Sequence, residues 1–351
     1  MLLGLPLLGV VAAGMPVAPY LAFPPRTLYV DHPPFSWTVF WGLTVLIAAA
    51  IAPFVYRGVT GKQPSSGGPE NRARAFPWWG WAGVAVCCGT WVLAWNRFPW
   101  LGPLQNHTFA PLWLGYILAV NGLVYRRTGR SPLTHHTRAY LSLFPISALF
   151  WWFFEYLNRF VQNWHYLGEP FDAWSYFWYA TLPFSTVLPA VLATRAWIGS
   201  FSWPEAKFRG FLPVRVPRPR GLAWTVLALA GAGLACIGVL PNALFPLLWV
   251  SPLLILVSLE TLFSGRHVFS PVTRGAWDGV VTAALAALVC GFFWELWNVY
   301  SQAKWVYSIP YVHRFQVFEM PILGYAGYLP FGLECVAVAE LFLGRRERGF
   351  P

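Results

Sequence analysis

Two apolar segments of the sequence each carry one carboxyl and two amide side chains at positions i, i+3 and i+7. On a helix this spacing places all three groups on one face. Such groups are costly to bury in hydrocarbon, so a stripe of them is expected to serve a site or an interface. The stripe residues are Glu155, Asn158 and Gln162 in the first segment, and Glu295, Asn298 and Gln302 in the second.

The carboxyl groups of the stripes could act as proton donors. A carboxyl that Trp and Phe shield from water stays protonated at neutral pH. Aromatic faces also attract cations, including a carbocation formed when an alkene is protonated. We therefore expect Glu155 or Glu295 to be a general acid for a lipid-soluble alkene. The other carboxylate or Glu334 would take the proton back, and Asn158 and Asn298 would orient these groups.

The aromatic residues that follow each stripe complete the expected site. They lie where helices are expected to reach the outer membrane surface, which favours Trp and Tyr. The predicted substrate-binding residues are Gln162, Trp164 and Tyr166 in the first segment, and Gln302, Trp305 and Tyr307 in the second.

Two other interpretations of the stripes stay open. Asn, Gln and protonated Glu also bond across transmembrane helix interfaces, so the stripes could simply hold helices together. In that case the chain would be a non-catalytic membrane subunit or a lipid- or pigment-binding protein. Alternatively, the same oxygen atoms suit Na⁺ or Ca²⁺ and would fit an ion or small-solute transporter.

The composition predicts the elements that must position these residues. Hydrophobic residues make up 57% of the chain and charged residues only 11%, whereas about 25% charged residues is usual in soluble domains. Long apolar runs without alternation favour membrane-spanning helices over a barrel. We expect an all-α polytopic membrane protein of about ten spans: 2–23, 35–56, 78–96, 109–125, 141–164, 176–198, 221–240, 243–263, 275–302 and 320–343.

The first of these segments is expected to be a span, because no basic residue precedes it as in a signal peptide. The chain has a net charge of +11, and most of its basic residues fall in alternate loops of the predicted topology. This bias predicts an inner-membrane protein with both termini in the cytoplasm, where anionic lipid is the natural partner and nucleic acid is not. The basic loops and tail are 57–74, 126–138, 195–220, 266–274 and 345–348.

The two stripes mark an internal duplication. Their residues repeat at an offset of 140, and the following W-x-Y residues repeat at an offset of 141. An even number of spans in each unit keeps both copies in one orientation, and the matching faces are expected to converge. We expect an N-terminal two-helix addition (1–77), a first four-helix repeat (78–199), a basic Pro-rich cytoplasmic linker (200–220) and a second repeat with a basic tail (221–351).

The remaining motifs predict neither a metal site nor a cofactor. The five cysteines lie in apolar segments without C-x-x-C spacing, so they are expected to be small buried side chains. Phosphate loops, diphosphate motifs and serine-hydrolase motifs have no counterpart in the sequence. The expected partners are a membrane lipid or isoprenoid substrate, with room for a membrane-protein partner or a homo-oligomer.

One order of residues resembles the lycopene cyclase domain of carotenoid-synthesising membrane proteins. It consists of an acidic residue, W-x-Y, a Gly-containing turn, Pro and then Glu in an apolar helix. The resemblance implies proton-initiated chemistry on an isoprenoid double bond, with intramembrane carboxylates as acid and base. The sequence departs from the family in having P-F-G-L-E for P-x-E-E and no carboxylate after Pro189. The carriers are Glu295, Trp305, Tyr307, 323–330 and Glu334, and in the first unit Glu155, Trp164, Tyr166 and Pro189.

Overall fold

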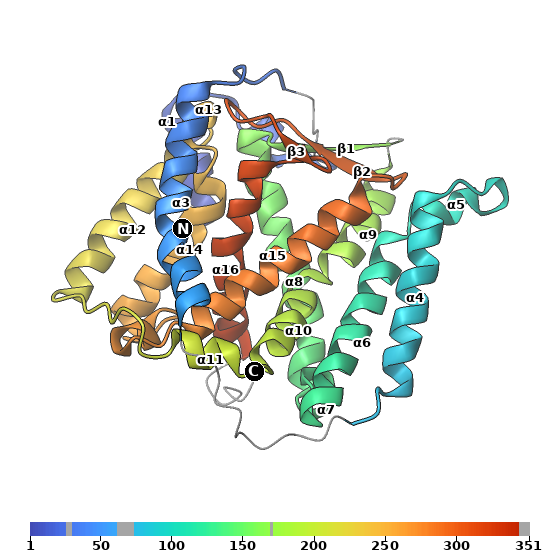
Figure 1. Cartoon of the computed structure of the whole chain (residues 1–351). Coiled ribbons are helices and arrows are strands. Elements are labelled where there is room, and N and C mark those ends of the chain that lie inside the picture. The colour runs from blue at the N-terminus through green and yellow to red at the C-terminus, as the bar shows by residue number, and fades with distance from the viewer. Residues whose placement is uncertain (26–29, 62–73, 169–170, 344–351) are drawn as a thin grey trace.

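The computed structural model describes residues 1–25, 30–61, 74–168 and 171–343. The chain is mainly helical, and its long helices run between two ends of the molecule (Figure 1). Short strands lie at one end, which we call the ribbon end, whereas α7 and α11 lie at the other. The first part of the chain contains α1 (Gly4–Ala12), α2 (Ala18–Leu21) and α3 (Trp37–Thr60).

Longer helices follow in each half of the chain. The first half holds α4 (Trp78–Trp95), α6 (Phe109–Thr128), α8 (Thr137–Val161) and the consecutive α9 (Ala173–Phe184) and α10 (Val187–Gly199). The second half holds α12 (Pro219–Cys236), α14 (Leu247–Phe263), α15 (Asp278–Asn298) and α16 (Tyr328–Leu343). Short helices connect them: η1 (Pro99–Leu101), α5 (Gly102–Gln105), α7 (Pro132–His135), α11 (Trp203–Phe208), α13 (Pro241–Leu244), η2 (Ser270–Arg274) and η3 (Ile322–Gly327).

Six helical segments of the described residues are long and apolar enough to cross a membrane. This supports a multi-pass membrane protein and corrects the expectation of ten spans. The six segments are Trp37–Thr60, Thr137–Val161, Ala173–Gly199, Pro219–Cys236, Asp278–Asn298 and Ile322–Leu343.

The other expected spans fall short for identifiable reasons. At about 1.5 Å per residue, the nine residues of α1 cannot cross a hydrocarbon core of about 30 Å. Five of the 18 residues of α4 are Trp, and α6 contains Asn121, Arg126 and Arg127, so both helices are less apolar. The helix α14 is a shorter apolar helix of 17 residues.

The two halves use matching helix pairs. In the first half α4 packs against α6, and in the second half α12 packs against α14. Figure 1 shows these pairs at opposite sides of the molecule, with α8, α10, α15 and α16 between them. The contacts of α10 with α15 and α16 join the two halves in the middle.

The predicted basic loops gather at one end of the molecule. Helix α6 carries Arg126 and Arg127 in its last turn, α10 carries Arg195 and α11 carries Lys207, and α7 and α11 lie at the end opposite the ribbon (Figure 1). The expected linker between the halves is partly helical, because α11 packs against α15 and α3. The basic residues in 62–73 and in 344–351 lie outside the described residues.

An antiparallel ribbon joins the two halves at the other end. Strand β1 (Trp164–Leu167) follows α8, and β2 (Lys304–Tyr307) follows α15. Their register pairs Trp164 with Tyr307 and Tyr166 with Trp305. At the offset of 141, Trp164 corresponds to Trp305 and Tyr166 corresponds to Tyr307, so each pair joins a Trp of one strand to the Tyr of the other. The ribbon therefore has the two-fold symmetry expected of a duplicated chain. A second, smaller sheet pairs β3 (Gln316–Val317) with β4 (Met320–Pro321).

Candidate functional site

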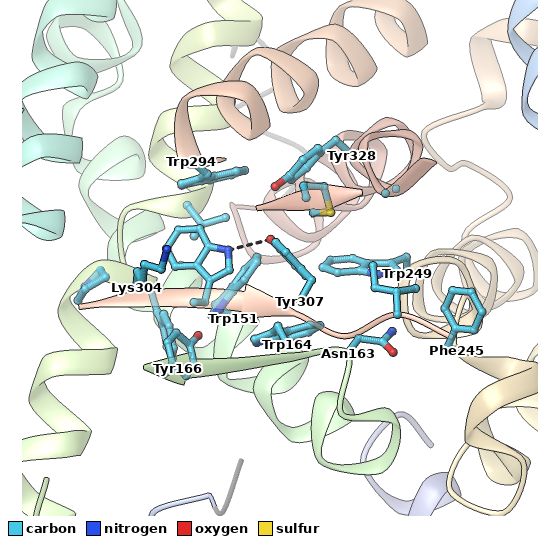
Figure 2. Close-up of a pocket in the computed structure, with 18 of the residues that line it drawn as sticks. Trp151, Asn163, Trp164, Tyr166, Phe245, Trp249, Trp294, Lys304, Tyr307 and Tyr328 are labelled. Carbon is cyan, nitrogen blue, oxygen red and sulfur yellow. Dashed lines mark hydrogen bonds between the residues drawn. The ribbon is translucent and has the colours of Figure 1, made fainter. Parts of the chain in front are cut away.

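An apolar cavity of about 730 Å³ lies between the ribbon and the neighbouring ends of the central helices. Ligand sites in proteins typically have volumes of about 300–1,000 Å³. Aromatic side chains from both halves face this space, as Figure 2 shows for Trp151 and Trp164 of the first half and for Trp249, Trp294 and Tyr328 of the second. The four predicted residues Trp164, Tyr166, Trp305 and Tyr307 all line the cavity.

Glu155 lies behind the first half of this aromatic wall. It is buried on α8, and its Oε1 accepts hydrogen bonds from Trp151 Nε1 at 3.2 Å, Trp164 Nε1 at 3.0 Å and the Tyr166 hydroxyl at 2.6 Å. Its three donors line the cavity, whereas Glu155 does not. Its Oε2 is buried and has no protein partner. The carboxyl therefore reaches the cavity only through these aromatic groups.

Glu295 has the equivalent position behind the second half of the wall. It is buried on α15, and its Oε1 accepts hydrogen bonds from the Tyr307 hydroxyl at 2.6 Å and the Tyr328 hydroxyl at 2.8 Å. Trp305 Nε1 donates to the Tyr307 oxygen at 2.8 Å, the contact drawn in Figure 2. Again the aromatic residues line the cavity and Oε2 has no protein partner. The two stripes thus converge on one cavity, through their donors.

Asn158 and Asn298 connect each helix to its strand. Asn158 Nδ2 donates to the Trp164 carbonyl at 2.8 Å, and Asn298 Nδ2 donates to the Trp305 carbonyl at 2.7 Å. The Oδ1 atom of each amide accepts from backbone N–H groups of the following segment. Both side chains therefore fix the strand that carries the Trp and Tyr of the wall, and neither faces the cavity.

The third member of each stripe leaves the helix face that the sequence predicts. The helix α15 ends at Asn298, so Gln302 falls in the following turn and is exposed. Gln162 is the C-cap of α8 with φ of 52°, and its Nε2 bonds to the Arg159 carbonyl. Neither glutamine lines the cavity. The prediction that all three polar residues share one helix face is therefore wrong for the third residue in both halves.

Glu334 lies apart from the other two carboxyl groups. It is buried on α16, further along the helix than the cavity-lining residues Tyr328 and Pro330. Its Oε2 atom has no protein partner. Glu334 itself does not line the cavity. The geometry therefore gives Glu334 no direct path to the cavity.

Several residues of the site are not among those that the sequence predicts. Trp151 lies one helical turn before Glu155, and Tyr328 lies in the Gly-containing turn of the second half, so spacing could have suggested both. The polar groups Asn163 and Lys304, which occupy equivalent positions before or at the start of the strands, also line the cavity. Asn163 Oδ1 is buried without a protein partner, so it is available to accept a hydrogen bond from a ligand.

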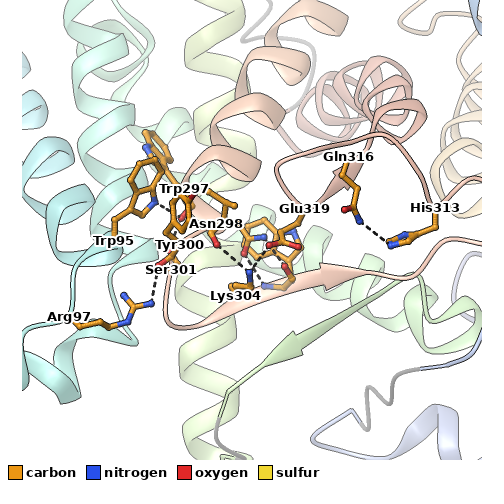
Figure 3. Close-up of polar contacts among 12 residues, drawn as sticks. Trp95, Arg97, Trp297, Asn298, Tyr300, Ser301, Lys304, His313, Gln316 and Glu319 are labelled. Carbon is orange, nitrogen blue, oxygen red and sulfur yellow. Dashed lines mark hydrogen bonds and ion pairs between the residues drawn. The ribbon is translucent and has the colours of Figure 1, made fainter.

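Polar contacts fix the edge of the site near Lys304. Lys304 Nζ forms an ion pair with Glu319 at 2.6 Å and donates to the Val299 carbonyl at 3.2 Å. Figure 3 shows this pair beside Asn298 at the start of the ribbon. Lys304 is the single charged side chain among the described lining residues. With its charge balanced by Glu319, the cavity favours an uncharged ligand.

Helix α3 crosses the open side of the cavity. At the ribbon end Ser36 N–H donates to the Tyr311 carbonyl at 2.9 Å. At the opposite end Arg57 Nε donates to the Lys207 carbonyl at 2.7 Å. Between these anchors the helix has few protein neighbours, and Leu46 lines the cavity while 65% exposed. Together with Ile47, it borders the cavity on this side, which we call the mouth.

The wall tyrosines are neutral groups. Burial raises the pKa of the Tyr166 and Tyr307 phenols well above the usual value, and the adjacent carboxyl groups raise it further. A phenol in this setting can still pass on a proton if it regains one in the same step, because no phenolate accumulates. The arrangement can therefore relay protons between a buried carboxyl and an apolar ligand.

No family model, curated protein or solved structure matches the chain.

Proposed function

We propose that the protein is an intramembrane acid–base enzyme for an isoprenoid, carotenoid or similar lipid, with cyclase- or hydratase-like protonation of an alkene. One observation carries this proposal: in both halves a buried carboxyl oxygen accepts hydrogen bonds from aromatic donors that line the same cavity. The resemblance to lycopene cyclase domains supports the same chemistry, since Glu295, Trp305 and Tyr307 lie together.

The lining supports an apolar and unsaturated ligand. Indole and phenol faces dominate the wall, and they stabilise positive charge that develops on a bound hydrocarbon. The cavity excludes most water from that charge, which strengthens the interaction. The mouth beside α3 would let a ligand that is dissolved in the bilayer enter without crossing water.

The proton would travel through a phenol. The tyrosine O–H bond breaks as the alkene π electrons form a new C–H bond, and the carboxyl gives its proton to the phenol oxygen. The resulting carbocation later loses a proton to a buried carboxylate, or adds water and gives the extra proton to a carboxylate, and becomes a neutral product. The sum is an isomerisation or hydration, so no redox cofactor takes part.

The orientation in the membrane is part of the proposal. Basic residues favour the cytoplasmic side, so the end with α7 and α11 would face the cytoplasm and contact anionic lipid. The ribbon and the cavity would then lie toward the outer surface of the inner membrane. Lys304, Glu319 and the exposed Gln302 would meet water there.

A lipid- or pigment-binding protein without catalysis is the second candidate. One observation favours it: the glutamates lie behind the wall, and their Oε1 atoms hold cavity-lining aromatic side chains in place. Buried carboxyl groups can serve packing alone. The two candidates share the same ligand class and differ in whether the bound lipid exchanges protons.

Mass spectrometry of lipids that co-purify with the protein tests both candidates. We expect a polyene or prenyl lipid at near-stoichiometric amounts after purification in mild detergent. Incubation of this complex in deuterated water should then introduce carbon-bound deuterium into the lipid if the protein is an enzyme. A bound lipid that takes up no deuterium would support the binding protein, and the lack of any enriched lipid would contradict both.

A bulky residue at the mouth should block loading. Replacing Ile47, which faces the cavity from α3, with Trp is expected to lower bound lipid at least several-fold, because the larger ring fills the mouth. Lipid occupancy by mass spectrometry is the measurement. Val45→Trp is the matched control, since Val45 is 65% exposed on the same helix and does not line the cavity. Equal occupancy in both variants would show that the lipid enters elsewhere.

A further inference from the structure

The two carboxyl sites have the same frame but different hydrogen-bond donors. Glu155 accepts two indole N–H groups and one phenol, whereas Glu295 accepts two phenols. An indole N–H can only donate. A phenol can donate and accept, so it can exchange a proton with the carboxyl beside it. The two sites are therefore suited to different directions of proton transfer.

A reciprocal exchange of two residues produces this difference. At the offset of 140, Trp151 of the first half corresponds to Gly291 of the second. At the offset of 141, Val187, the first residue of α10, corresponds to Tyr328, the first residue of α16. A Cβ at Gly291 would overlap the Tyr328 ring. The loss of the tryptophan in the second half thus makes the space in which Tyr328 reaches Glu295.

The indole of the strand tryptophan is also used differently. In the first half Trp164 Nε1 donates to the carboxyl oxygen of Glu155 at 3.0 Å. In the second half Trp305 Nε1 donates to the Tyr307 oxygen at 2.8 Å. A fixed donor stabilises negative charge on the atom that accepts it. In the first half the indole therefore favours negative charge on the Glu155 carboxylate. In the second half it favours negative charge on the Tyr307 oxygen while that oxygen transfers its proton.

A charged neighbour distinguishes the two carboxyls as well. Arg159 lies four residues after Glu155 on α8, which places the two side chains on one helix face in the favourable order of acid before base. The equivalent position after Glu295 is Val299. Arg159 NH1 also donates to the Tyr20 carbonyl at 2.8 Å, which holds the guanidinium near this face. A cation thus accompanies the first carboxyl and is missing at the same position in the second.

We propose, building on the proposed function, that Glu295 with Tyr307 and Tyr328 is the proton-donating site and that Glu155 with Tyr166 is the proton-accepting site. Tyr307 gives its proton to the alkene and takes one from neutral Glu295. The C–H electrons next to the carbocation then form the new double bond, and that proton passes to Tyr166 as Tyr166 gives its own to the Glu155 carboxylate. Glu155 releases this proton to water and Glu295 regains one from water, which resets the enzyme.

Infrared spectroscopy tests the two protonation states directly and needs no substrate. At neutral pH, the spectrum of the wild type minus that of Glu295→Gln should contain the carbonyl stretch of a neutral carboxylic acid. The wild type minus Glu155→Gln should contain the antisymmetric stretch of a carboxylate. The same signal for both residues, or the reverse assignment, would overturn the division.

Conservative variants cover the case in which a glutamine variant fails to fold. Trp151→Phe removes an indole donor from Glu155 alone and should shift its carboxylate band, while Tyr328→Phe should shift only the carbonyl band of Glu295. Crossed effects would count against the division. Since these spectra do not depend on turnover, a correct division with no deuterium uptake would reject the enzyme and keep the assignment. The opposite result would reject only the assignment.

Discussion

Replacing Tyr307 with Phe is expected to lower deuterium uptake into the bound lipid by roughly 10²–10⁴-fold, the usual contribution of a positioned acid or base. Tyr307 lines the cavity and bonds both to Glu295 and to Trp305. In the variant Glu295 keeps Tyr328 as a hydrogen-bond donor. The variant lacks the phenol oxygen that accepts from Trp305 and that passes the proton from Glu295 to the ligand. The ring itself remains, so the ligand should still bind.

The control for this prediction is Tyr325→Phe. Tyr325 lies on η3 close to the cavity, but it does not line it, and its hydroxyl donates to the Val317 carbonyl at 3.1 Å. The variant removes a hydroxyl of the same kind nearby, so we expect lipid occupancy and deuterium uptake close to the wild type. Uptake that survives in Tyr307→Phe to within a few-fold would show that the proton reaches the lipid by another route.

The parts of the site that follow from local spacing were predictable from the sequence. The spacing of Glu155 and Asn158, repeated in Glu295 and Asn298, predicts side chains on one helix face, and the structure buries all four. The strand aromatics that the sequence assigned to ligand binding line the cavity. Their catalytic roles stay predictions, because hydrogen bonds and burial alone do not test them.

Other features depend on contacts that no local pattern encodes. The helix α15 ends where Asn298 bonds to the next strand, so the turn that excludes Gln302 depends on a side chain closing onto the backbone. The role of Tyr328 depends on the small residue Gly291 on another helix. The ten expected spans exceed the six candidates among the described residues. One reason is that the Trp residues of α4 count as hydrophobic in the composition but lower its mean hydropathy.

The duplication that the sequence predicts would explain why the site is both symmetric and divided. A duplicated ancestor would supply two carboxyls, two tethering asparagines and one ribbon, and the paired exchange of Trp151 with Gly291 and of Val187 with Tyr328 keeps donors at each carboxyl. A Gly at position 151 or a Val at position 328 alone would remove one hydrogen-bond donor from a buried carboxyl. A Trp at position 291 alone would overlap the Tyr328 ring. Changes at these positions are therefore expected to have arisen together. A destabilising substitution at Gly291 should be compensated only by a second substitution at Tyr328.

The aromatic residue that joins the two halves should contribute most to stability. Phe331 on α16 is fully buried, and its ring lies 5.5 Å from Phe154 of the first half and 6.2 Å from Trp294 of the second. We expect Phe331→Ala to lower the free energy of unfolding by about 3–5 kcal/mol, because the surrounding rings cannot collapse into the space left behind. Thermal unfolding in lipid nanodiscs is the measurement.

A matched variant on the same helix shows whether burial is the cause. Phe342 is 60% exposed, so Phe342→Ala should change stability by no more than about 0.5 kcal/mol, as is usual at surface positions. Phe331→Leu should recover most of the loss, since it refills much of the volume. A small effect of Phe331→Ala would mean that the two halves are held together mainly by the ribbon and the α10–α15 contact. In that case the cavity between them could widen without unfolding, and its size would no longer limit the ligand.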